Sequence, residues 1–302
     1  MNLQKKGMTM KKNRNKIIFI ISMLIFGSIG LFVRKIPIPS LHIAFIRSFV
    51  GTFVMVFIYF FSKKKIDKKA VLSNKSSLFF GGVFLGINWI LLFEAYKNTT
   101  ITSATLAYYM APIMFILLTA VIFGVRLTGI RVITILLSFF GLAVLQMKDI
   151  TVMNDMDSTG ILYGLAAAFF YALVIIFNRR MKNIGGMDRT FMELLLSLLV
   201  LGIYMGASGE FEAFYIPVEA LPYALVLGII HTGLAYFLYF STVDKLDSQH
   251  VALLSYVDPL SAILFSVVLL GEAFYFNMAM GALLILGSSI LFDLVGKKEQ
   301  KR

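Results

Sequence analysis

The sequence has 302 residues, a length that suits one large or two small soluble domains, but its composition excludes a soluble fold. Hydrophobic residues make up 59%, charged residues only 15%, and the mean hydropathy is +0.86, whereas a soluble domain carries about 25% charged residues. The absence of Cys excludes disulfides, thiolate metal sites and Cys nucleophiles. The formal net charge of +12 indicates loops that orient a membrane protein. Nucleic-acid binding is not expected, because no basic stripe is interleaved with exposed aromatic residues.

Apolar runs between clusters of charge predict ten membrane spans. About 20 apolar residues in a helix cross a hydrocarbon core about 30 Å thick, and helices are required because a lone strand in lipid leaves its backbone groups without partners. The first run is too long for a signal peptide and has no small-residue cleavage site, so we interpret it as a retained helix. The ten runs are Ile17–Val33, Leu41–Phe61, Leu78–Tyr96, Ser103–Phe123, Thr128–Met147, Gly160–Phe177, Arg189–Ala207, Ala220–Ser241, Gln249–Leu270 and Phe276–Val295.

Lys and Arg are distributed unevenly between the two sides of these spans. If the N-terminus is cytoplasmic, the inner segments hold 23 of the 28 basic residues and the outer loops hold 4, with Arg47 inside a span. Short cytoplasmic loops of membrane proteins are enriched in Lys and Arg. The sequence therefore predicts a multi-pass protein of the cell (plasma) membrane with both termini in the cytoplasm.

The second half of the chain repeats the first in opposite orientation. Spans one and two match six and seven more weakly, through Phe32–Lys35 against Phe177–Arg180. Each half has five spans, and an odd number makes the second half enter the membrane from the other face. The loop after span four is basic, whereas its counterpart after span nine carries Glu272. The matched positions are Gly81 with Gly228, Gly86 with Gly233, Phe93 with Phe240, Ala111-Pro112 with Asp258-Pro259, and Gly124 with Gly271.

Two similar halves of opposite orientation can exchange conformations around a site near the midplane, which is alternating access. The sequence therefore predicts an all-α polytopic membrane protein with ten transmembrane helices in a 5+5 inverted repeat. Its parts are a cytoplasmic N-terminal tail (1–16), a first repeat (17–147), a second repeat (159–295) and a cytoplasmic C-terminal tail (296–302).

Three stretches of the chain resemble the EamA-like branch of the drug/metabolite transporter superfamily. They are "NWILLFEAYKNTTITSATLAYYMAPIMFIL", "HIAFIRSF" and "SYVDPLSAILFSVVLLGEAFYFNMAMGALLILG". The last is the most specific, since Pro, Gly-Glu and two late glycines have the family's spacing. The first repeat departs from this pattern at Val125-Arg126, where the family often has Gly-Glu. The resemblance covers nearly all of residues 17–295 and implies ten helices, a central cavity and carriage of small metabolites.

Ionisable groups inside spans cost about 2.5–3.5 kcal/mol on insertion scales and each needs an explanation. Asp258 comes ten residues into span nine, next to Pro259, and suits a proton or ammonium site; the alternative is an Asp that caps the broken turn. Pro112 and Pro259 each predict a helix irregularity. Glu94 in span three suits a substrate amine or a pair with Lys97. His231 in span eight suits proton coupling or a neutral imidazole bonded to a neighbouring helix.

Arg47 in span two is always charged and must find an acceptor. It aligns loosely with Glu193 in span seven, so a structural ion pair and contact with a substrate carboxylate are both open. Amide and aromatic side chains within spans also suit a cavity wall or packing. These candidates are Asn88, Trp89, Tyr108, Tyr109, Tyr236, Tyr239 and Tyr256. Tyr108, Tyr109 and Tyr256 rank first, because they lie on the two Pro-bearing spans.

The sequence favours a secondary carrier of a small metabolite, an amino acid or related compound, with export favoured over import. A broad-specificity exporter of cationic drugs is the main alternative. A membrane-embedded enzyme on a lipid-linked substrate is disfavoured, because only Asp149, Asp155 and Asp157 cluster, without a positioned base. The expected partners are the substrate and the lipid bilayer, and glycines such as Gly281 and Gly287 would suit a homodimer contact. No catalytic residue, metal or cofactor is expected, since no nucleotide-binding or metal motif is present.

Overall fold

The computed structural model describes residues 2–62, 65–124, 128–146, 155–246, 251 and 254–299. Helices connected by turns and loops make up these residues, and no strand occurs among them. The Val125-Arg126 departure and Asp149 lie outside the described residues. The all-helical class predicted from the composition is confirmed.

The described residues of the first half form eight helices, and two of these have only five or six residues. They are α1 (Asn2–Gly27), α2 (Ile29–Val33), α3 (Ser40–Ser62), α4 (Lys68–Ser73), α5 (Lys75–Asn98), α6 (Ile101–Tyr108), α7 (Ala111–Phe123) and α8 (Gly129–Gln146). The described elements of the second half are α9 (Asp155–Arg180), α10 (Gly186–Ser208), α11 (Leu221–Gly228), the π-helix η2 (Ile229–Leu234), α12 (Ala235–Thr242), the 3₁₀ turn η3 (Val243–Lys245), α14 (Val257–Leu270) and α15 (Phe276–Glu299).

Among the residues that the structure describes, seven helical stretches of 21 to 24 residues are long and apolar enough to cross a membrane. They are Asn13–Val33, Ser40–Phe61, Lys75–Asn98, Ile101–Phe123, Ser158–Arg180, Gly186–Ser208 and Leu221–Thr242. Three shorter apolar helices, Gly129–Val144, Val257–Leu270 and Phe276–Leu291, lie at the positions of predicted spans five, nine and ten. The chain is therefore a multi-pass membrane protein.

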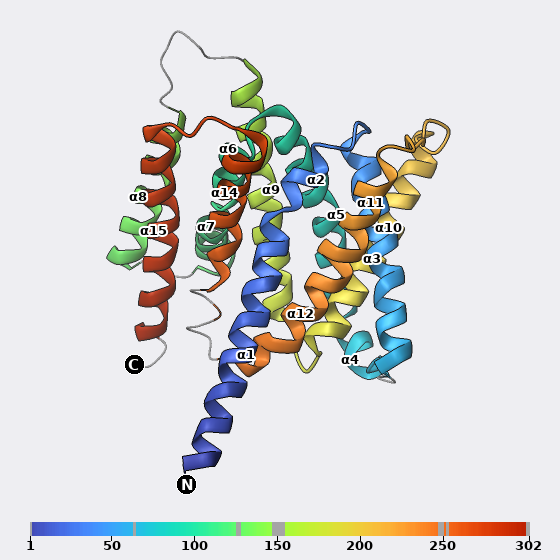
Figure 1. Cartoon of the computed structure of the whole chain (residues 1–302), viewed down its shortest axis with the longest axis horizontal. Helices are drawn as coiled ribbons and strands as arrows, with labels where there is room; N and C mark the ends of the chain where they lie inside the picture. Colours follow the sequence, from blue (N-terminus) through green and yellow to red (C-terminus); the bar gives the residue numbers. More distant parts are fainter. Residues whose placement is uncertain are drawn as a thin grey trace.

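Both terminal helices extend beyond the predicted spans. α1 begins at Asn2 and α15 continues to Glu299, so most residues of the two expected tails are helical. Lys, Gln and Glu favour helix nearly as well as Leu does, and both segments continue a helix that is already formed. The start of α1 and the end of α15 lie at the same end of the molecule (Figure 1). We call this end the terminal face and the other end the opposite face.

Helices from the two halves pack against one another through small residues. α5 lies against α9 and α10, α1 against α12 and α14, and α8 against α15 (Figure 1). A Cβ atom at Gly82 of α5 would lie 2.6 Å from the Cβ of Leu196 on α10, so this contact requires glycine. Gly287 is exposed and has no atom within 4 Å of its Cβ position, so the homodimer contact stays a prediction.

Several spans are interrupted in their middle. The fourth span turns at Tyr109 and Met110, between α6 and α7, and Pro112 follows within the first turn of α7. A turn at Tyr256, the repeat counterpart of Tyr109, precedes α14, whose third residue is Pro259. Proline cannot donate the backbone hydrogen bond that would continue each helix. The eighth span instead changes to a π-helix at η2, a feature often found at functional sites.

Candidate binding cavity

A cavity of about 380 Å³ lies between the two halves. Its size is within the range of about 300–1,000 Å³ that is usual for small-molecule sites. Of the residues predicted from the sequence, those that line this cavity are Arg47, Asn88, Trp89, Tyr108, Tyr109, Pro112, Tyr236, Tyr239 and Asp258. They come from α3, α5, α6, α7, α12 and α14, so the fold brings together groups that are up to 211 residues apart in the chain.

Arg47 is buried on the cavity wall and is held by hydrogen bonding and ring stacking. Its Nε donates to the Thr232 hydroxyl at 2.9 Å, and its guanidinium carbon lies 4.2 Å from the centroid of the Trp89 ring. The Thr232 hydroxyl itself donates to the carbonyl of Leu227, five residues earlier in the chain. The π-turn therefore positions the acceptor of Arg47. No ion pair joins Arg47 to a carboxylate within the described part of the chain.

Asp258 lies in the first turn of α14 and lines the cavity. Its Oδ2 accepts a hydrogen bond from the Tyr109 hydroxyl at 2.7 Å. The Tyr109 and Tyr108 rings meet edge to face, and the Tyr108 and Tyr171 centroids are 5.5 Å apart. The Asp258 carboxylate therefore lies beside a cluster of tyrosine side chains. No Lys, Arg or His among the described residues forms an ion pair with it.

Two buried polar groups on the wall have oxygens without hydrogen-bond partners among the described residues. Asn88 is fully buried and donates from Nδ2 to the carbonyl of Ala167 at 2.7 Å, but its Oδ1 has no partner. Glu193 on α10 is 5% exposed, and its Oε1 also has no partner. Leaving such groups unpaired is costly, and both residues belong to the lining of the cavity.

The sequence indicated Glu193 only as the position that aligns loosely with Arg47, and its place in the cavity lining was not predicted. Glu193 is the fifth residue of predicted span seven, whereas α10 begins at Gly186, so Glu193 lies about one turn further into the helix than the predicted span indicates. Tyr96, Tyr171, Asn178 and Arg189 also line the cavity and were not singled out. Glu193 carried one usable signal, since it is a carboxylate within an apolar run.

Glu94 lies outside this cavity. It lines a separate hollow of about 600 Å³ at the opposite face, together with Arg34 and Lys97. The Lys97 ammonium donates to the carbonyl of Ile38, and Glu94 accepts from the Asn98 amide at 3.3 Å. No Glu94–Lys97 ion pair occurs among the described residues, so the proposed pairing of these two side chains is not present there.

His231 and Tyr256 also lie away from the cavity wall. His231 is 1% exposed, and its two ring nitrogens contact the Ser28 hydroxyl at 2.9 Å and the carbonyl of Val226 at 3.2 Å. The ring therefore ties η2 to the junction of α1 and α2. Tyr256 is buried in an apolar cluster with residues of α6 and α15. Pro259 is buried on α14 and, unlike Pro112, is not part of the lining.

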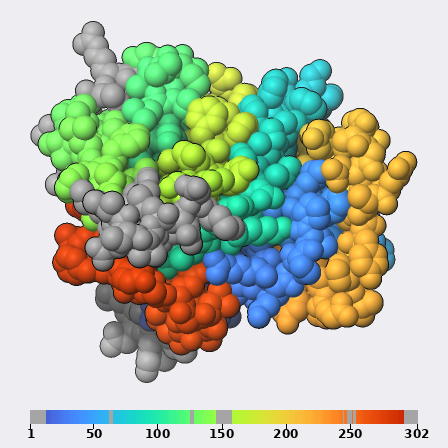
Figure 2. Space-filling model, turned by 90° about the horizontal axis from the view of Figure 1, so that it is seen from above, coloured from blue at the N-terminus to red at the C-terminus, as the bar shows by residue number. Residues whose placement is uncertain are grey.

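The cavity is closed at the opposite face by a group of interactions that we call the Arg34 clamp. Arg34 forms an ion pair with Glu272 at 2.6 Å and donates to the carbonyls of Tyr96, at 3.1 Å, and Thr99. The same Glu272 oxygen accepts the backbone N–H of Ile101, at 3.0 Å, at the start of α6. The clamp therefore joins the α2–α3 turn and the α5–α6 junction of the first half to the α14–α15 loop of the second (Figure 2).

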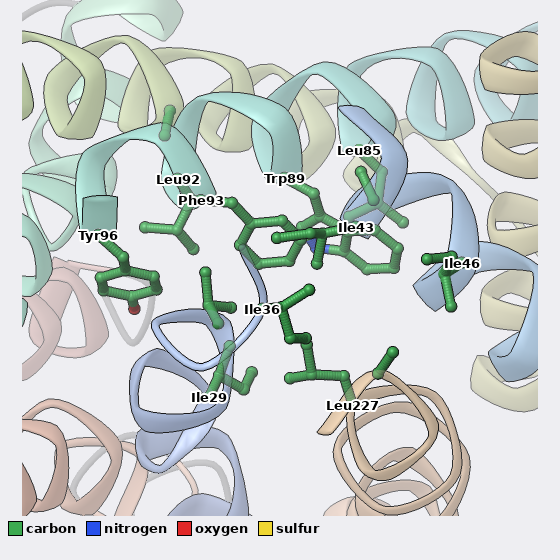
Figure 3. Close-up of a cluster of buried hydrophobic side chains, with 14 of the residues drawn as sticks. Ile29, Ile36, Ile43, Ile46, Leu85, Trp89, Leu92, Phe93, Tyr96 and Leu227 are labelled. Carbon is green, nitrogen blue, oxygen red and sulfur yellow. The ribbon is translucent and has the colours of Figure 1, made fainter. Parts of the chain in front are cut away.

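An apolar cluster lies beneath this clamp. In Figure 3, Trp89 and Phe93 of α5 face Ile36 and Ile43, and Ile29 lies below Ile36. At its other end the cavity lining extends to Asn178, Arg189 and Phe240. These residues lie within the end turns of α9, α10 and α12, at the terminal face. The cavity thus extends towards the terminal face and is blocked at the opposite one.

A cavity lined by both charge signs, set between interrupted helices of a multi-pass protein, is the arrangement found in membrane transporters. The chain matches the EamA-like transporter family over residues 15–147 and again over residues 158–292. It therefore belongs to this family, and the resemblance seen in the sequence is confirmed. Within the described residues, no group of three His, Cys, Asp or Glu side chains that could hold a metal ion occurs.

Similar proteins carry transporter names. The uncharacterized transporter YxxF of Bacillus subtilis is 29% identical over 269 residues, which cover 86% of this chain and 83% of that protein. The uncharacterized inner membrane transporter YicL of Salmonella typhimurium is 25% identical over 298 residues, covering 93% and 96% of the two chains. A crystal structure that is 18% identical superposes with a TM-score of 0.61 over 95% of this chain and 99% of that one, which shows a shared fold.

Proposed function

We propose that this transporter is a secondary carrier of a small metabolite, an amino acid or related compound, that works by alternating access. The observation that carries the proposal is the central cavity, which is blocked at one face by the Arg34 clamp and reaches the other. In this proposal all ten apolar helices cross the bilayer, as two five-helix halves of opposite orientation.

The helix contacts support the inverted repeat. Gly81 and Gly86 of α5 lie against α10, and their repeat counterparts Gly228 and Gly233 lie against Val50 and Val54 of α3. Likewise, α9 contacts α6 as α1 contacts α14. In this proposal, a pseudo-two-fold axis relates each contact to its counterpart, so that the contact of α9 with α6 corresponds to that of α1 with α14. Such an axis gives two related conformations that open to opposite sides.

The clamp is not repeated in the sequence at the terminal face. The counterpart of Arg34 is Arg179, whose guanidinium carbon lies 4.5 Å from the centroid of the Phe115 ring, and the residue aligned with Glu272 is Val125. Without a carboxylate at that position, closure at the terminal face lacks the equivalent ion pair. This asymmetry favours the state that is open towards the terminal face.

The distribution of Lys and Arg supports a cytoplasmic terminal face, and a relative named as an inner membrane transporter supports the cell membrane as the location. The state described here is then open to the cytoplasm, where a substrate for export would enter. Export is therefore favoured over import in this proposal.

Substrate recognition in this proposal uses both charge signs of the cavity. Arg47 suits a carboxylate, and Asp258 suits an amine or, as a separate hypothesis, a coupling proton. A cationic drug would use Asp258 but would also face Arg47, so the drug-exporter alternative is less well supported.

Exchange in proteoliposomes tests the proposal. Vesicles preloaded with a mixture of unlabelled L-amino acids should accumulate a labelled amino acid transiently, and empty vesicles should not. The same amino acid should raise the melting temperature of the purified protein, because ligands that bind only the folded state stabilise it. Folded protein that neither exchanges nor is stabilised by any of the 20 amino acids would refute the proposed substrate class.

A further inference from the structure

Arg47 and Glu193, which face the same cavity, lie too far apart to neutralise each other. Both contact α5: the Arg47 guanidinium stacks on Trp89, and the Glu193 Oε1 lies 2.7 Å from the Cβ position of Gly81. Trp89 and Gly81 are eight residues apart, which corresponds to about 12 Å of helix rise. The attraction between two charges falls with distance, so each of these buried groups needs another partner.

Asp258 lies between them in depth. Measured from the opposite face, Arg47 is seven residues into α3, Asp258 is twelve residues from the end of α14, and Glu193 is fifteen residues from the end of α10. At 1.5 Å per residue these positions are about 10, 18 and 22 Å deep. The cavity therefore has one cation at its blocked end and two carboxylates nearer its mouth.

Arg47, Asp258 and Glu193 each keep hydrogen-bonding atoms that their protein partners leave free: donors at the blocked end of the cavity and acceptors nearer its mouth. The Nε of Arg47 is occupied by Thr232, which leaves the terminal guanidinium nitrogens, the pair that binds a carboxylate in two-point fashion. Asp258 uses one oxygen for Tyr109, and Glu193 has an oxygen with no partner among the described residues. An ammonium group has three N–H donors and no acceptor, so it suits both carboxylates.

We propose that the cavity binds a dibasic amino acid such as L-lysine. Its α-carboxylate contacts Arg47, its α-ammonium contacts Asp258, and its side-chain ammonium contacts Glu193. The aliphatic stem packs against the tyrosine cluster that includes Tyr108. Arg189, one turn from Glu193 at the mouth, is half-buried and forms no ion pair with it among the described residues. The Asn178 side chain hydrogen-bonds to the Glu193 carboxylate, and the substrate ammonium takes the remaining capacity of that carboxylate.

This inference rests on the proposed function. The two can be tested separately with analogues of L-lysine that each lack one of its charged groups. In the exchange assay, labelled L-lysine competes with L-norleucine, which lacks the side-chain amine, and with cadaverine, which lacks the carboxylate. We expect L-lysine to compete at least tenfold better than either. Equal competition by L-norleucine would overturn the dibasic inference but leave amino acid transport in place. Absence of exchange with L-lysine would also overturn the dibasic inference, whereas the proposed function is overturned only if none of the 20 amino acids exchanges or stabilises the protein.

Two variants, measured in the same competition assay, test which side chain contacts which charged group of L-lysine. Glu193→Gln should remove the preference for L-lysine over L-norleucine. Arg47→Gln should remove the preference for L-lysine over cadaverine. Glu219→Gln, a matched change at an exposed loop residue, should alter neither. A Glu193→Gln protein that melts like the wild type and keeps the L-lysine preference would overturn the assignment; should that variant melt early, Glu193→Asp, which keeps the charge, should retain the preference.

Discussion

The Arg34 clamp should hold the cavity closed at the opposite face, and Glu272→Gln should release it. The side chain of Glu272 is 6% exposed and that of Arg34 is 30% exposed. Breaking a fully buried ion pair costs about 3–5 kcal/mol and an exposed one about 0–1 kcal/mol, so this partly buried pair should contribute about 2 kcal/mol. That energy corresponds to an increase of about 30-fold in the population that opens at the opposite face.

The chain has no Cys, so one introduced thiol reports access without background. Thr105→Cys is a suitable probe, because Thr105 is 2% exposed, lines the cavity, and lies four residues from the start of α6. A membrane-impermeant maleimide applied from the opposite face should label this thiol slowly. Adding Glu272→Gln should raise the labelling rate by up to about 30-fold.

Two controls separate opening from unfolding. Ser255→Cys lies at the other end of the cavity lining, and Glu272→Gln should not raise its labelling from the terminal face. The charge exchange Arg34→Glu with Glu272→Arg should restore slow labelling at position 105. If Glu272→Gln leaves the rate at position 105 unchanged, or raises both rates equally, the clamp does not act as a gate.

Three further predictions concern the role of Asp258 in proton coupling, the helix contact at Gly82 and the stacking of Arg47 on Trp89. If Asp258 carries a coupling proton, Asp258→Asn should abolish the dependence of uptake on a pH gradient but leave exchange; if Asp258 binds the substrate α-ammonium, as inferred above, the same change should weaken uptake and exchange equally. Gly82→Ala should lower the melting temperature by several degrees, because the added Cβ meets Leu196 and overpacking costs about 1–3 kcal/mol; Gly129→Ala, which meets no atom within 4 Å, should not. Trp89→Leu should weaken exchange two- to tenfold, because the ring face under Arg47 contributes about 0.5–2 kcal/mol, and Trp89→Phe should retain most of it; equal rates for the two variants would contradict the ring contact.

The membrane class and most of the helices could be predicted because lipid imposes a simple requirement. Each span must satisfy its own backbone hydrogen bonds and present an apolar surface, so a run of apolar residues suffices to locate it. The sequence also placed both interruptions near Pro112 and Pro259, since proline removes a backbone donor wherever it occurs. The helical extension of both tails was not predicted, because those polar segments lack the apolar pattern that signals a span.

The composition of the cavity was decided by tertiary structure. Asp258 and Arg47 could be singled out as intramembrane charges, but Glu94 and His231 met the same criterion and lie elsewhere, in a surface hollow and in a helix contact. Which side chains converge depends on how the helices rotate about their axes, and an apolar run carries little information about that rotation. The clamp between Arg34 and Glu272 joins residues 238 positions apart, and only the packing of one half against the other brings such residues within hydrogen-bond distance.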